Sequence, residues 1–125
     1  MRAAILALGF GLTAGGAFAQ QDLRFNGGVG DFDLSLSGVQ ATVMHADDGM
    51  LRLAIAMDSE NRLRFATFTA LSVGEDITAT LCGHQIVQAR LQAQIDSGYV
   101  MSSPLDADLA QELADVINGL RGCAD

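Results

Sequence analysis

The sequence has no lysine and no tryptophan, and its 125 residues include only one proline, one tyrosine, two cysteines and two histidines. All seven basic residues are arginines, and 15 acidic residues give the chain a net charge of −8 at pH 7. An acidic chain without a basic cluster repels the phosphates of nucleic acids and of anionic lipids at long range. We therefore expect no nucleic-acid partner.

The scarcity of cysteine and histidine also argues against a metal centre. A zinc site would require His45 and His84 together with acids such as Asp47 or Asp48, and nothing in the spacing brings the two histidines together. Asp31 with Asp33 and Asp47 with Asp48 offer carboxylate oxygens, but neither pair extends into the longer loop of alternate acids that calcium requires. No Gly-x-Ser-x-Gly motif marks a nucleophilic serine. The sequence therefore predicts no metal, no cofactor and no catalytic residue, with a small hydrolase of unrecognised site as an open alternative.

Long apolar runs are missing as well. The longest reaches from Ala3 to about Leu12, whereas a membrane span needs roughly 20 apolar residues. Arg2 before this run and Ala17-Phe18-Ala19 after it are typical of a secretory signal that is cleaved after Ala19. We therefore predict a signal peptide at 1–19, no stable membrane insertion after its cleavage, and a periplasmic or secreted bacterial protein.

Residues 20–125 should form one secreted domain, because their number suits a single modest core. Without Arg2 they carry six arginines against 15 acidic residues, a net charge of −9. Cys82 and Cys123 are the only cysteines, and an even pair in an exported chain favours a disulfide. Their spacing is unlike the close Cys-x-x-Cys pair of redox enzymes, so we predict a structural bridge.

Period-two alternation of apolar residues predicts a series of β-strands. Phe32, Leu34 and Leu36 alternate in one phase, and the next strand from Val39 to Val43 alternates in the other. A two-residue turn at Ser37-Gly38 would reconcile the two phases on one apolar face.

Two further turns extend the same pattern. A loop at Asp47-Asp48-Gly49 would place Val43 opposite Leu53 and Ala41 opposite Ile55. A second loop at Ser59-Glu60-Asn61 would start a strand at 62–71 and set Ile55 opposite Phe65. Another strand is predicted around Ile77, Ala79 and Leu81.

Residues 86–96 leave two alternatives open. From Val87 to Ile95 the apolar residues alternate without exception, which favours a strand, but glutamine, alanine, arginine and leucine are also good helix formers. The C-terminal part is clearly helical: Ser103 can cap, Pro104 suits the first helical position, and an apolar stripe follows at helical spacing. We predict this helix at 104–120.

Together these elements predict an α+β fold. An antiparallel β-meander of about six strands would have one apolar face, and the amphipathic helix at 104–120 would pack on that face.

The opposite face of the predicted sheet offers the one surface with a functional signal. In the predicted register Met44, Arg52, Arg64 and Phe68 lie together there, and exposed apolar groups beside arginine suit a protein partner or an anionic amphiphile. In the alternative interpretation, the segment around Leu23 and Phe25 covers this face. The sequence therefore predicts a non-enzymatic interaction or accessory module with a periplasmic protein partner, or alternatively a carrier of a small apolar or anionic ligand.

Overall fold

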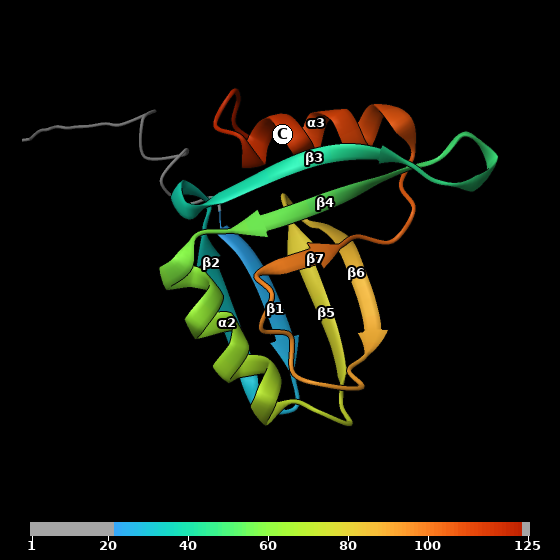
Figure 1. The fold of residues 1–125 in the computed structure, drawn as a ribbon. Helices are drawn as coiled ribbons and strands as arrows, with labels where there is room; N and C mark the ends of the chain where they lie inside the picture. The colour runs from blue at the N-terminus through green and yellow to red at the C-terminus, as the bar shows by residue number, and fades with distance from the viewer. Residues whose placement is uncertain (1–21, 124–125) are drawn as a thin grey trace, which may run out of the picture.

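A computed structural model describes residues 22–123, so the predicted signal peptide lies outside the described residues. Within this range seven antiparallel strands form two sheets, and two α-helices pack with them. In Figure 1 the strands of the smaller sheet run across the direction of the larger one, and the C-terminal helix lies along an edge of the smaller sheet. The predicted α+β class, the antiparallel pairing and the C-terminal helix are confirmed, but the strands are divided between two sheets.

The larger sheet has the spatial order β2-β1-β5-β6. The sequence analysis did not predict strand β1 (Asp22–Gly27), in which Leu23 and Phe25 are fully buried. A tight turn at Gly27–Gly30 joins it to β2, and Gly30 has φ +113°. The predicted strand around Ile77 lies beside β1, with all three apolar side chains buried. The members of this sheet are β1 (Asp22–Gly27), β2 (Gly30–Ser35), β5 (Asp76–Leu81) and β6 (His84–Arg90).

The smaller sheet contains β3 (Val39–His45), β4 (Leu51–Met57) and β7 (Tyr99–Met101), with β4 in the centre. The predicted β3–β4 register is confirmed, since Val43 pairs with Leu53. The loop between them is also where the sequence predicts it, and Asp48 and Gly49 adopt the left-handed conformations that such a loop requires (φ 62° and 76°).

The predicted hairpin at Ser37-Gly38 is wrong. Residues Leu36–Gly38 form a short 3₁₀ helix that carries the chain from β2 in one sheet to β3 in the other. Gly38 packs so closely against Asp58 and Asn61 that a Cβ atom there would collide with both side chains. The change of phase in the alternation therefore marks a change of sheet.

The predicted strand at 62–71 is also wrong, because these residues belong to helix α2 (Ser59–Leu71). Asp58 is its N-cap, and the Asp58 carboxylate accepts a 2.9 Å hydrogen bond from the Asn61 N–H. Phe65 and Phe68 lie three residues apart, which places both on the buried side of a helix. The sequence analysis expected this segment to pair with β4. The strand that does so is β7, in which Val100 pairs with Ile55.

In the ambiguous segment 86–96 the strand ends at Arg90, and the residues up to Ile95 are neither strand nor helix. An irregular register between Ala79 and Thr80 leaves Ile86 and Val87 both buried, so the alternation does not continue as one buried face. Leu91 donates a backbone hydrogen bond to the Glu75 carbonyl and accepts one from the Gly74 N–H, so the pairing with the β5 side ends one residue beyond Arg90.

The C-terminal helix α3 is shorter than predicted, Ala107–Ile117. Asp106, rather than Ser103, is its N-cap and accepts from the Asp108 N–H at 3.2 Å. Leu105, inside the predicted helix, instead pairs with Leu51, the first residue of β4. Beyond the helix, Leu120 is 74% exposed and does not join the buried stripe.

One hydrophobic core fills the space between the sheets and both helices. Phe25 and Phe65 lie with ring centroids 4.8 Å apart, and Phe32 stacks on Phe68 at 5.2 Å. The predicted disulfide is confirmed: Cys82, in the β5–β6 turn, is bonded to Cys123 after α3, with a Cα–Cα distance of 5.3 Å. No helix within 22–123 is long and apolar enough to cross a membrane.

Candidate functional site: the outer face and free edge of the small sheet

The small sheet has one face in the core and one face toward solvent. Side chains alternate between the faces of a strand, and Leu53 and Ile55 of β4 are fully buried, so the residues between and beside them point outward. The pairing of β3, β4 and β7 then defines the outer face. It consists of Gln40, Thr42, Met44, Arg52, Ala54, Ala56, Tyr99 and Met101, and Ala54, between Thr42 and Met101, is only 2% exposed.

Two of the four predicted surface residues lie together on this outer face. Met44 pairs directly with Arg52 across the β3–β4 ladder, and the Met44 side chain is 42% exposed. Arg64 and Phe68 are elsewhere, on α2, because the segment that carries them is a helix. Phe68 is only 6% exposed, so its predicted place on the surface is a correction that follows from the helical spacing.

Arg64 has a structural environment of its own. Its guanidinium carbon lies 5.2 Å from the centroid of the Phe32 ring, within the range of a cation–π interaction. Its Nη1 also donates to the Asn61 side chain at 3.4 Å. These contacts hold Arg64 beside the aromatic cluster and away from the outer face.

The sequence analysis missed two residues of the outer face, both on β7. Tyr99 is 49% exposed and lies beside Ala56, and Met101 is 40% exposed and lies beside Ala54. Their signal in the sequence was the short alternation Tyr99-Val100-Met101, in which only Val100 is buried. The segment around Leu23 and Phe25 belongs to β1 in the other sheet, so it does not cover this face.

The outer face differs from the rest of this acidic protein in charge. Arg52 is its only charged member, and the Arg52 Nη1 makes a long 3.4 Å bond to the Ser102 carbonyl. The outer side of the large sheet is different: Arg24 is paired there with Asp33 at 2.9 Å, and this bond raises the pKa of the Arg24 guanidinium. Three large apolar side chains without an acidic neighbour on the same face are the composition of a protein-binding surface.

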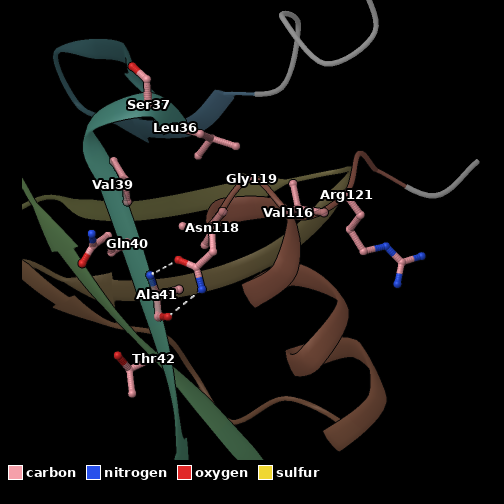
Figure 2. A pocket seen from close by; sticks show the side chains of 11 residues that line it. Leu36, Ser37, Val39, Gln40, Ala41, Thr42, Val116, Asn118, Gly119 and Arg121 are labelled. Carbon is pink, nitrogen blue, oxygen red and sulfur yellow. Dashed lines mark hydrogen bonds between the residues drawn. The ribbon is translucent and has the colours of Figure 1, made fainter. Parts of the chain in front are cut away.

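A groove of about 670 Å³ lies next to this face, between β3 and the end of α3 (Figure 2). Leu36, Val39 and Thr42 line one side, and Val116 and Gly119 line the other. Arg121 also lines the groove, and in Figure 2 its side chain extends away from β3. The groove therefore runs along the edge of β3 that has no neighbouring strand.

The side chain of Asn118 crosses this groove. Its Oδ1 accepts a 2.8 Å hydrogen bond from the Ala41 N–H, and its Nδ2 donates a 2.9 Å bond to the Ala41 carbonyl (Figure 2). A carboxamide with one acceptor and one donor has the same hydrogen-bonding groups as a backbone peptide. Asn118 therefore meets the β3 edge as one residue of an added strand would.

The residues considered for catalysis or metal binding do not form a site. His45 lies at the end of β3 and His84 at the start of β6, so the two exposed histidines belong to different sheets. Within residues 22–123 no three histidine, cysteine or acidic side chains are arranged to hold a metal ion.

Comparison with known proteins gives a fold relationship and no family. No protein-family model matches the sequence, and no curated protein matches it. Two solved structures match the fold, both of SecDF, the first described as a membrane component that enhances protein export. The first has a TM-score of 0.62, is 18% identical, and is matched over 72% of this chain and 43% of its own.

The second structure is SecDF in a super-membrane-facing form, with a TM-score of 0.61, 18% identity, and coverage of 72% of this chain and 13% of that one. The present chain thus spans less than half of either matched chain. At this identity the likeness shows that the fold is shared.

Proposed function

We propose that this chain is an exported accessory domain that binds another protein outside the cytoplasm, within the machinery of protein export. Its binding surface is the outer face of the small sheet, on which Met44, Tyr99 and Met101 are the large exposed apolar side chains. The observation that carries the proposal is the exposure of these three side chains on a face that has one arginine and no acid, in a chain of net charge −8.

Two further observations support the place of action. The disulfide between Cys82 and Cys123 requires an oxidising compartment to form and persist, which agrees with a cleaved signal at 1–19. The shared fold with part of SecDF supports a role beside the export machinery, because that protein enhances export. Fold alone does not specify function, so the experiment addresses the surface directly.

Site-directed photo-crosslinking in the producing cells tests the proposal. A photoreactive amino acid at Tyr99 should give one discrete protein adduct, and the same adduct should form from Met101 on the same face. Gln88, exposed on β6 of the large sheet, is the matched control position and should give no such adduct.

Adding Met44→Glu to the Tyr99 probe should lower the yield of the adduct several-fold, because it replaces an exposed apolar side chain of the proposed contact with a carboxylate that must lose its hydration, and it pairs that carboxylate with Arg52 across the ladder. The same adducts from Gln88 and Tyr99, or no protein adduct from either β7 position, would refute the proposed surface.

A further inference from the structure

The free edge of β3 carries backbone groups that a partner strand could use. In an antiparallel ladder, alternate residues direct their N–H and C=O groups to opposite edges. The N–H and C=O of Ala41 point away from β4 and bond the Asn118 carboxamide. Because of the alternation, the N–H and C=O groups of Val43 and His45 point to the same side. In the described part of the chain no hydrogen bond outside the ladder engages the backbone of Val43.

Apart from the end of α3, whose Asn118 meets Ala41, this edge lacks the features that natural proteins use to protect exposed strands. Charged side chains, proline, bulges and very short strands discourage pairing at an edge. β3 is seven residues long, and it has no acid, arginine or proline and an unbroken register with β4.

The other sheet edges are better protected. β2 carries Asp31 and Asp33, β7 has only three residues, and the Ile86 carbonyl of β6 already accepts from the Ser103 N–H. The free edge of β3 is therefore the least protected strand edge within residues 22–123.

From this arrangement we infer a strand-addition site. An extended segment of another polypeptide pairs with β3 from Ala41 to His45, and the Asn118 carboxamide closes this edge until the segment replaces it at Ala41. An added strand would lie beside Thr42 and Met44, and its outward side chains would extend the outer face. The inference rests on the proposed function, since it specifies how the partner of that face is held.

Charge favours a foreign segment over a second copy of this chain. Two copies, each with a net charge of −8, repel each other at long range, whereas a neutral or basic segment does not. The groove of about 670 Å³ is open along β3, and its only charged lining residue is Arg121. We expect the segment to be extended, uncharged at its centre and free of proline.

Val43→Pro tests the inference selectively. Proline removes the Val43 N–H, which faces away from β4, so the β3–β4 ladder keeps all its hydrogen bonds. Val43→Ile is the matched control, because it keeps the N–H and the apolar side chain. His45→Pro at the strand end is the second variant if Val43→Pro does not fold, which thermal unfolding of each variant will show.

The probe is a fluorescent nine-residue peptide of alternating threonine and valine with a lysine at each end, and its control is the same peptide N-methylated at alternate amides. Fluorescence anisotropy should show binding of the first peptide only. Val43→Pro should weaken that binding about tenfold and Val43→Ile should leave it unchanged. Asn118→Ala should strengthen it several-fold, because the competing intramolecular amide is gone.

Several results would overturn the inference: equal binding of both peptides, equal binding by Val43→Pro and the unaltered protein, or no peptide binding. A dimer in sedimentation equilibrium that Val43→Pro dissociates would assign the edge to a second copy and refute the foreign segment. The Tyr99 adduct separates this inference from the proposed function. If the adduct is lost in Met44→Glu but persists unchanged in Val43→Pro, the proposed function stands and strand addition fails.

Discussion

Thr69 and Ser72 are two small hydroxyl residues near the end of α2, both fully buried, and their hydroxyl groups have different surroundings. The Thr69 Oγ1 accepts from the Ile95 N–H at 2.9 Å and donates to the Ala66 carbonyl at 3.1 Å. The Ser72 Oγ has no hydrogen-bond partner. A buried polar group adds stability only when it is paired, so the two residues should respond oppositely to loss of the hydroxyl.

We predict that Thr69→Val lowers the free energy of unfolding by about 1–3 kcal/mol, because the part-buried Ile95 N–H would lose its acceptor. Ser72→Ala should leave this free energy unchanged or raise it by up to about 1 kcal/mol. Urea unfolding of the two variants measures both values, and equal losses would contradict the assignment of these hydrogen bonds.

At the scale of the element, α2 is a helix that the sequence pattern assigned to a strand. Alternation of Leu63 with Phe65 suited a strand, and Asn61 suited a turn, so a local reading favoured a hairpin. The helical signal was the set Phe65, Ala66, Phe68 and Thr69, which are all buried at spacings of three and four residues. Asp58 in front of this set is the N-cap that begins the helix.

We predict that Asp58→Ala lowers the free energy of unfolding by about 1 kcal/mol, because the Asn61 N–H loses its acceptor. Asp58→Asn keeps a side-chain oxygen at the cap and should stay within about 0.5 kcal/mol of the unaltered protein. Denaturant titrations compare the pair; similar losses in both variants would show that the charge of Asp58, and not the cap, stabilises α2.

At the scale of the whole molecule, the disulfide joins parts that no strand pairing connects. Cys82 belongs to the turn between β5 and β6 in the large sheet, whereas Cys123 follows the helix that packs on β3 and β4 of the small sheet. The 41-residue separation means that the bridge restricts a large loop of the unfolded chain. Its main effect is therefore on the stability of the entire domain.

The double variant Cys82→Ser and Cys123→Ser should unfold with a free energy about 3–4 kcal/mol lower than the oxidised protein, as the loop-entropy estimate gives for this separation. Thermal unfolding with and without reductant gives an independent reading, since reductant should lower the midpoint of the unaltered protein only. An unchanged midpoint on reduction would contradict a stabilising role for the bridge.

The sequence predicted the outer face in part, and the reason lies in the range of each interaction. Met44 and Arg52 belong to one hairpin, so the Asp47-Asp48-Gly49 loop was enough to bring them together. Tyr99 and Met101 reach the same face from more than 40 residues away, through pairing of β7 with β4. The Asn118 contact with Ala41 spans 77 residues and left no pattern in the sequence.

Local chemistry therefore determined by itself the β3–β4 hairpin, the C-terminal helix and the pairing of the two cysteines. Each depends on neighbouring side chains, on helical spacing or on there being only one possible partner. The tertiary structure decided which strands share a sheet. Backbone hydrogen bonds are alike in every strand, so they do not distinguish one partner strand from another, and the packing of the whole core selects the pairing. The same packing positioned α3 so that Asn118 reaches the free edge of β3, and thereby created the groove that the proposed partner segment would occupy.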